Sequence, residues 1–158
     1  MTLARNRKAA GFAKWVMVVK ENLSEYEKTQ NVVMRSSIEV HQLLRERALS
    51  EDVERMYVIC LDGQNRMKYL HEVSRGGLHG CAVAPRDILR IVIMAASSAF
   101  VLVHNHPSGD PTPSREDVVM TKTIAEAAKV VGVSLADHVI IGGWNKHSSM
   151  FNLGLLGA

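Results

Sequence analysis

One short apolar run that ends in two histidines limits the folds open to this chain more than any other feature. Residues 100–104 predict a buried strand, and His104 and His106, at positions i and i+2, place both imidazoles on one face of that strand. A loop with three prolines follows, and Ser114 then begins the pattern of a long helix that carries Asp117. The chain is therefore expected to bring a strand end and a helix start together.

Two imidazole nitrogens and one carboxylate oxygen form a ligand set typical of a catalytic zinc site. Such a site leaves its fourth tetrahedral position to water, and the metal can make that water a nucleophile at neutral pH. We therefore predict that His104, His106 and Asp117 bind one Zn2+ per chain. A structural zinc site is more often closed by thiolates, and the sequence has no cysteine near this segment.

Ser114 and Asp117 also have a purely structural interpretation. The pattern Ser-x-x-Asp at a helix start resembles a capping box, and a carboxylate in the first turn favours the helix dipole. Because the two histidines precede this pair, we prefer Asp117 as a metal ligand. Ser114 is expected to cap the helix and also to donate a hydrogen bond to an oxyanion near the metal.

A site of this type needs a general base that accepts a proton from the attacking water. Glu54 stands at the start of the most apolar strand, where a carboxylate beside the core can have a raised pKa. From spacing alone, a solvated carboxylate at a strand end is an equally good interpretation of Glu54. The other candidates for the base are four further acidic residues, Asp62, Glu72, Asp110 and Glu116.

The composition is that of one folded domain with a short extension. The 158 residues are 47% hydrophobic and 22% charged, which is enough to bury a core and argues against disorder. A net charge of +3 is compatible with only weak nucleic-acid contact. Cys60 and Cys81 fit reduced thiols, and the longest apolar run, residues 91–103, is too short to cross a bilayer. We therefore expect a soluble cytoplasmic protein without membrane association.

Residues 1–34 differ from the rest of the chain and are predicted to form a basic N-terminal extension. Phe12, Trp15 and Val19 have near-helical spacing among lysines and arginines, which predicts one amphipathic helix followed by a linker. This helix could pack on the domain or on a second subunit of a homo-oligomer, or it could contact nucleic acid weakly. The compact domain is expected over residues 35–158.

Beyond the extension, strand patterns and helix patterns alternate after a hairpin, which predicts an α/β fold with a mixed β-sheet between helices. Strands are expected at 56–61, 66–74, 100–104, 135–141 and 147–151, and helices at 37–48, 85–96 and 114–131. His138 is predicted to be a core or edge histidine that could instead support the metal site. The remaining histidines are predicted at the surface or at sheet edges: His41, His71, His79 and His147.

Four segments together resemble the RadC-type (UPF0758-like) branch of the JAMM or MPN-domain zinc metalloproteases. They are Glu54–Asp62, Glu72–Gly76, Val103–Asp117 and Asp137–Gly142. The short matches Asn65-Arg66 and Pro85-Arg86 lie between them, and all of these segments are within residues 35–158. The resemblance implies a JAMM/MPN-type, cytidine-deaminase-like α/β fold. It is carried mainly by the long His-x-His-Pro-Ser-Gly-Asp-Pro-x-Pro-Ser-x-x-Asp segment.

The same resemblance implies a role for each of five residues. The zinc ligands of the family fall on His104, His106 and Asp117, its catalytic glutamate on Glu54, and its assisting serine on Ser114. It implies hydrolysis of a peptide or isopeptide bond in a peptide or protein-conjugate substrate. Glu54 would move the proton and Ser114 would stabilise the tetrahedral oxyanion.

Two other classes of function can be compared with these expectations. A DNA-repair or nucleic-acid-associated accessory protein with a structural or vestigial metal site would use the basic residues 1–34, and its DNA binding would be salt-sensitive. Longer relatives carry a helix-hairpin-helix module before this domain, which residues 1–34 are too short to form. A zinc deaminase of nucleobases would need His-x-Glu and Pro-Cys-x-x-Cys, and the sequence has neither.

Overall fold

The computed structural model describes residues 32–50, 52–75 and 83–157. Nearly all of the predicted extension at 1–34, including its amphipathic helix, lies outside the described residues, as do Cys81 and His79.

Five strands form one mixed sheet in the order β2-β1-β3-β4-β5. Their bounds are β1 (Arg55–Leu61), β2 (Met67–Arg75), β3 (Ala99–Asn105), β4 (Ser134–Gly143) and β5 (Lys146–Ser149). The central strand β3 pairs antiparallel with β1 and parallel with β4, while the β1–β2 and β4–β5 pairs are antiparallel hairpins. The predicted mixed sheet is therefore confirmed.

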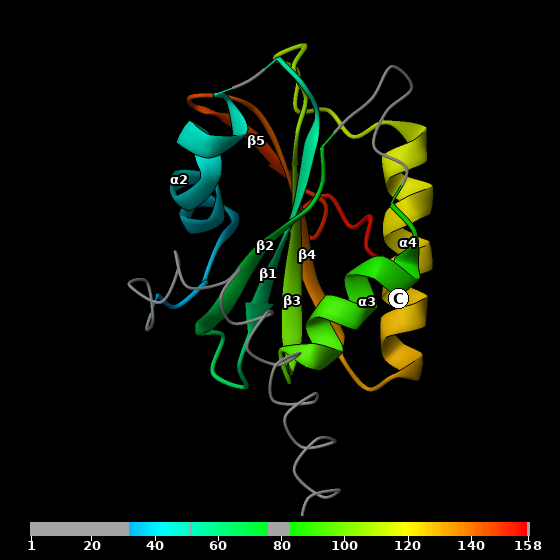
Figure 1. Cartoon of the computed structure of the whole chain (residues 1–158). Helices are drawn as coiled ribbons and strands as arrows, with labels where there is room; N and C mark the ends of the chain where they lie inside the picture. The colour runs from blue at the N-terminus through cyan, green and yellow to red at the C-terminus, as the bar shows by residue number, and fades with distance from the viewer. Residues whose placement is uncertain (1–31, 51, 76–82, 158) are drawn as a thin grey trace, which may run out of the picture.

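Helices cover both faces of this sheet. Helix α2 (Ser37–Ala48) lies on one face, and α3 (Pro85–Met94) and α4 (Arg115–Val130) lie on the other (Figure 1). Strand β1 is buried at every position because alternate side chains enter two different cores. Tyr57, for example, packs in the core under α2, whereas Val58 packs in the core under α3 and α4. This two-sided burial explains the continuous apolar run in the sequence.

Local signals predicted the starts of the three helices and the end of α4, whereas α3 ends at Met94, two residues before the expected end. Ser36 caps α2 in a capping box with Glu39, and Pro85 is the first residue of α3. Helix α4 begins directly after Ser114, and Gly132 follows its end with a φ of 75°, a conformation that glycine adopts without strain. Among the described residues, no helix combines the length and the apolar character needed to cross a membrane.

Two sequence-based expectations were wrong. The last strand ends at Ser149, because Asp137 accepts hydrogen bonds from the Ser149 hydroxyl at 2.6 Å and from the Phe151 backbone N–H at 3.0 Å, in a turn that leaves the sheet. His41 is buried and not on the surface. Its ring stacks on that of His147 with centroids 4.8 Å apart, and its Nε2 lies 2.9 Å from the carbonyl oxygen of Gly143.

Candidate metal centre

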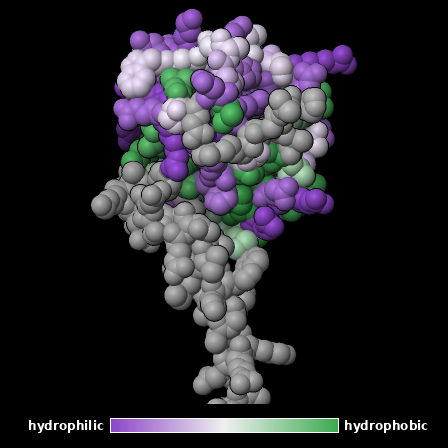
Figure 2. Space-filling model, turned by 45° about the horizontal axis from the view of Figure 1, so that its top comes forward, coloured by the Kyte–Doolittle hydropathy of each residue, from purple (hydrophilic) through white to green (hydrophobic). Residues whose placement is uncertain are grey.

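The predicted ligands meet where β3 ends and α4 begins, at the upper end of the molecule in Figure 1. His104 is completely buried in β3, His106 follows that strand and is partly exposed, and Asp117 is 8% exposed in the first turn of α4. Figure 2 turns this end toward the viewer, and hydrophilic residues predominate on it. A metal bound here would therefore lie between the core and a polar surface.

Three ligand atoms converge at this position. The Nε2 atoms of His104 and His106 are 2.9 Å apart. The Asp117 carboxylate completes the group, with Oδ1 3.3 Å from Nε2 of His104 and Oδ2 3.4 Å from Nε2 of His106. One atom from each residue lies within 4.8 Å of the others, so the three side chains could hold one metal ion. The three residues therefore lie together as the sequence analysis expected, and their binding of a metal stays a prediction.

Asp117 is also part of a capping box, so its two interpretations are compatible. Its backbone N–H donates to Ser114 Oγ at 3.1 Å. In return, Oδ2 accepts hydrogen bonds from the Ser114 backbone N–H at 2.8 Å and from the Ser114 hydroxyl at 2.6 Å. These bonds fix the carboxylate and direct its other oxygen toward His104. The start of α4 and the position of the ligand are therefore set by the same contacts.

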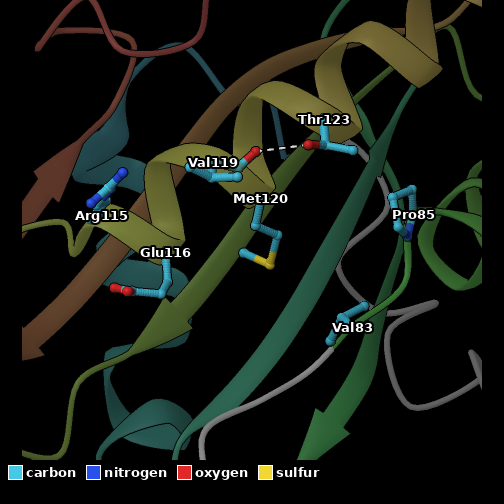
Figure 3. A pocket seen from close by; sticks show the side chains of 7 residues that line it. All are labelled: Val83, Pro85, Arg115, Glu116, Val119, Met120 and Thr123. Atoms are coloured by element: carbon cyan, nitrogen blue, oxygen red, sulfur yellow. Dashed lines mark hydrogen bonds between the residues drawn. The ribbon is translucent and has the colours of Figure 1, made fainter.

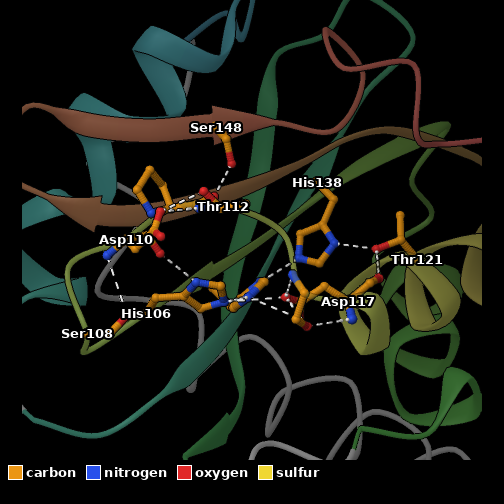
Figure 4. Close-up of polar contacts among 11 residues, drawn as sticks. His106, Ser108, Asp110, Thr112, Asp117, Thr121, His138 and Ser148 are labelled. Atoms are coloured by element: carbon orange, nitrogen blue, oxygen red, sulfur yellow. Dashed lines mark hydrogen bonds and ion pairs between the residues drawn. The ribbon is translucent and has the colours of Figure 1, made fainter.

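His106 is oriented by the proline-rich loop that follows it. Its Nδ1 lies 2.8 Å from the carbonyl oxygen of Asp110, which can only accept, so Nδ1 carries the hydrogen (Figure 4). The neutral ring then has its lone pair on Nε2, which faces the other ligands. The Asp110 carboxylate accepts the backbone N–H of Thr112 at 2.9 Å and its hydroxyl at 2.7 Å, so this candidate base serves to order the loop.

The loop itself is held against β4. A Cβ atom placed on Gly142 would lie only 2.6 Å from the nitrogen and the Cδ of Pro111, so this close approach requires glycine. The Ser148 hydroxyl donates to the Pro111 carbonyl, and the backbone N–H of His106 donates to the Ile141 carbonyl at 2.9 Å. The structure thus explains how a connection between a strand and a helix keeps one ligand in place.

The charges of the site favour a cation. Burial by itself would raise the pKa of Asp117, but the adjacent imidazoles of His104 and His106 and the hydrogen bond from Ser114 outweigh it and hold that pKa well below its usual range. The hydrogen bond to Asp117 is also the main reason that the pKa of His106 is raised. Asp117 is therefore ionised at neutral pH, and His106 must lose its proton before it can bind a metal.

Glu54 lies at the edge of this centre, immediately before β1. Its negative charge is the smallest of the causes that raise the pKa of His106. The side chain of Asn105 fixes the backbone on both sides of Glu54. Oδ1 of Asn105 accepts the N–H of Arg55 at 2.7 Å, and its Nδ2 donates to the carbonyl of Val53 at 3.1 Å. The residue between the two histidines therefore anchors the segment that carries Glu54.

Two side chains behind His104 complete the buried part of the site. His138 is completely buried on β4, and its Nε2 lies 2.8 Å from Nδ1 of His104. Its Nδ1 lies 2.6 Å from the hydroxyl oxygen of Thr121 on α4. From the sequence, His138 is predicted to be a core or edge histidine that could instead support the metal site, and no motif indicates Thr121. The i, i+4 spacing of Asp117 and Thr121 on one helix face was the available signal for Thr121.

The remaining candidate bases lie in other settings. Glu72 forms an ion pair with Arg55 at 3.3 Å, and Asp62 accepts backbone N–H groups in the β1–β2 turn. Glu116 is exposed and borders a largely apolar groove along α4 (Figure 3). The groove is lined by Val83, Pro85, Arg115, Glu116, Val119, Met120 and Thr123. None of the three ligands borders it, because Asp117 is on the buried side of α4.

Known relatives match most of the chain. UPF0758 proteins from Syntrophomonas wolfei and Desulforamulus reducens are 39% identical over 117 residues and 38% identical over 125 residues, which covers 72% and 79% of this chain. These alignments cover 50% and 55% of the relatives, so the chain spans about half of their length. A UPF0758 protein from Listeria welshimeri is 42% identical over 97 residues. This alignment covers 61% of this chain and 43% of the length of the relative.

The match to a family agrees with the fold and covers the candidate metal centre. Residues 34–155 match the RadC-like JAB domain, and this segment includes the whole sheet, the three flanking helices and every residue of the centre described above. The chain belongs to the RadC-like JAB domain family.

Proposed function

We propose that this chain is a zinc-dependent metallohydrolase that cleaves a peptide or isopeptide bond, with Glu54 as its general base. The observation that carries the proposal is the convergence of His104, His106 and Asp117 beside Asn105, whose side chain holds the backbone on both sides of Glu54. Two imidazoles and one carboxylate leave a tetrahedral ion one open position, which is typical of catalytic sites and not of structural ones. The relatedness to the JAB domain supports a metallohydrolase.

The donor set suits zinc in its chemistry. Nε2 of His106 is an acceptor when the ring is neutral. The Asp117 carboxylate is an anion that accepts two hydrogen bonds within its capping box and lies beside both rings. A zinc ion bound by such ligands would act as a Lewis acid and would make water nucleophilic near neutral pH. His104, His106 and Asp117 are the residues that would hold it.

In the proposed reaction, water adds to the carbonyl carbon of the scissile amide, and the bond from that carbon to nitrogen breaks. Glu54 accepts a proton from the attacking water and passes it to the departing nitrogen, so that an amine and a carboxylic acid are released, and the acid then loses its proton to the solvent. Asn105 keeps the backbone of Glu54 in place during this transfer. The peptide groups on either side of Glu54 are thereby tied to the strand that carries His104.

Ser114 is proposed to donate a hydrogen bond to the oxyanion that forms on the carbonyl oxygen. In the structure its hydroxyl donates to Asp117 Oδ2 at 2.6 Å. The proposed contact with the oxyanion therefore requires this hydroxyl to exchange partners when substrate binds. The backbone N–H of Ser114 would still hold the carboxylate, because it donates to the same oxygen at 2.8 Å.

The test combines metal analysis with a search for cleavage products. Zinc content is measured by elemental analysis on protein purified without chelators or a histidine tag. The zinc-loaded protein is then incubated with a proteome-derived peptide library and with isopeptide-linked conjugates, and mass spectrometry detects new termini. We expect about one zinc per chain, as a three-ligand site implies. Cleavage should be lost in Glu54→Gln while zinc is kept, and the exposed Glu116→Gln is the matched control.

Two results would contradict the proposed zinc-dependent hydrolase. Absence of zinc after zinc is added back, or cleavage by Glu54→Gln at the rate of the unchanged chain, would contradict the proposal. In the first case, the alternative is a nucleic-acid-associated accessory protein that acts through the basic residues 1–34. That alternative predicts salt-sensitive DNA binding that survives Glu54→Gln.

A further inference from the structure

A chain of buried side chains connects one ligand of the centre to the backbone of another. Nδ1 of His104 lies 2.8 Å from Nε2 of His138, and Nδ1 of His138 lies 2.6 Å from Oγ1 of Thr121. The same hydroxyl oxygen lies 2.6 Å from the carbonyl oxygen of Asp117. Figure 4 shows these contacts running from Thr121 through His138 toward the ligands. The two connecting side chains come from β4, which carries His138, and from α4, which carries Thr121.

The direction of these hydrogen bonds follows from elementary chemistry. A carbonyl oxygen can only accept, so the hydroxyl hydrogen of Thr121 must point to Asp117. The Thr121 oxygen then accepts from Nδ1–H of His138. A neutral imidazole carries one N–H, and complete burial favours the neutral form of His138, so its Nε2 is an acceptor. His104 must therefore donate from Nδ1.

We propose that Thr121 and His138 are positioning residues that fix His104 in the Nδ1–H tautomer, so that its Nε2 lone pair is directed at the metal. This inference rests on the proposed metal centre, but not on its hydrolytic activity. It also explains a difference between the two histidine ligands. His106 obtains the same tautomer from a backbone carbonyl in the loop, whereas His104 obtains it from two buried side chains. Once both lone pairs face Asp117, three acceptors converge, and a divalent cation satisfies all of them.

Zinc affinity tests the proposal without any substrate. The metal-free chain of 158 residues is titrated with zinc in competition with a chromophoric chelator. Thr121→Val removes the hydroxyl at nearly constant volume, and we expect it to weaken zinc binding by about 10- to 100-fold, the usual effect of losing a partner behind a ligand. Thr121→Ser keeps the hydroxyl and should bind zinc like the unchanged chain.

The same helix offers a matched control. The hydroxyl of Thr123 donates to the Val119 carbonyl at 2.9 Å, with the same i−4 spacing as Thr121 and Asp117, but on the exposed side of α4. Thr123→Val should leave zinc affinity unchanged. If Thr121→Val binds zinc as tightly as Thr123→Val does, the positioning role is refuted.

The tautomer can also be read directly. Two-bond 1H–15N correlations on metal-free protein with 15N-labelled histidine distinguish Nδ1–H from Nε2–H. We expect Nδ1–H on His104 and on His138 in the unchanged chain, with that preference at His104 weakened in Thr121→Val. Nε2–H on His104 in the unchanged chain would overturn the proposal, even if the variants did not fold. A chain that binds zinc, has the expected tautomers and cleaves nothing would contradict only the proposed hydrolase.

Discussion

The side chain of Asn105 accepts a hydrogen bond from the backbone N–H of Arg55 at 2.7 Å. Backbone pairing of β1 with β3 begins at the next residue of β1, where Met56 is opposite His104. The amide of Asn105 therefore continues the connection between the strands by one step, to the segment where the chain enters β1. Glu54 immediately precedes Arg55. The distance between the proposed base and β3 therefore depends on the buried side chain of Asn105.

Asn105→Ala should separate the proposed base from the metal centre. The N–H of Arg55 and the carbonyl of Val53 lose their partner, which should lower the free energy of unfolding by about 1–3 kcal/mol. Zinc should stay bound, because His104, His106 and Asp117 are unchanged. Urea unfolding and elemental analysis measure the two effects. A variant as stable as the unchanged chain would show that this amide does not anchor the segment.

Asp117→Ala should lose zinc, because it removes the only carboxylate of the predicted ligand set. Ser114→Ala removes the hydroxyl of the same capping box but no ligand. It should lower the free energy of unfolding by about 1 kcal/mol and retain zinc. Elemental analysis and thermal unfolding of both variants separate the two roles of the capping box. Zinc retained in both Asp117→Ala and His104→Ala would refute the assignment of the site.

Gly142→Ala should displace the loop that holds His106. The added Cβ would lie 2.6 Å from Pro111 and 2.8 Å from the carbonyl oxygen of Gly109, and neither backbone can move without shifting the loop. We expect zinc affinity to fall by at least about 10-fold while the sheet remains folded. Gly143→Ala is the matched control, since its nearest contact, the Lys146 side chain, is 3.8 Å away. Equal zinc affinities for the two variants, measured by chelator competition, would refute the proposed role of the close approach.

Zinc affinity should depend on pH through His106. The hydrogen bond to Asp117 raises the pKa of His106 above 6.5, so the ring keeps its proton to a higher pH than usual. A bound metal requires the neutral ring, and binding must therefore release that proton at any pH below the raised pKa. Affinity should increase by about 10-fold per pH unit in that range and level off above it. Chelator competition from about pH 6 to 8 measures the slope, and a flat profile would contradict the prediction.

The parts of the site that are local in sequence could be predicted, because each depends on only a few neighbouring residues. The i, i+2 spacing on a strand, the prolines of the loop and the Ser-x-x-Asp helix start brought His104, His106 and Asp117 together as expected. These signals do not depend on how the strands pair. The same holds for Ser114, whose capping role is visible in the pattern alone.

The contacts that depend on strand register could not be predicted. His138 reaches His104 only because β4 lies parallel to β3 with Leu102 opposite His138, which puts both rings on the face covered by α4. Nothing near His138 in the sequence indicates that register. The burial of His41 has a similar cause, because it requires α2 to pack where His147 of β5 can stack on the ring.

The three ligands all come from residues 104–117, whereas Glu54 joins them only through the pairing of β1 with β3. Closing so short a segment around an ion costs little chain entropy, while the pairing closes a much longer loop. Metal retention therefore depends on the segment 104–117 and the contacts that hold it, and not on the pairing that places Glu54. A preparation can then be fully metallated and still contain molecules in which the base is absent from the centre. The measured metal content per chain reports only whether residues 104–117 hold the ion. A signal that depends on Glu54 is needed to report how many molecules also have β1 paired with β3.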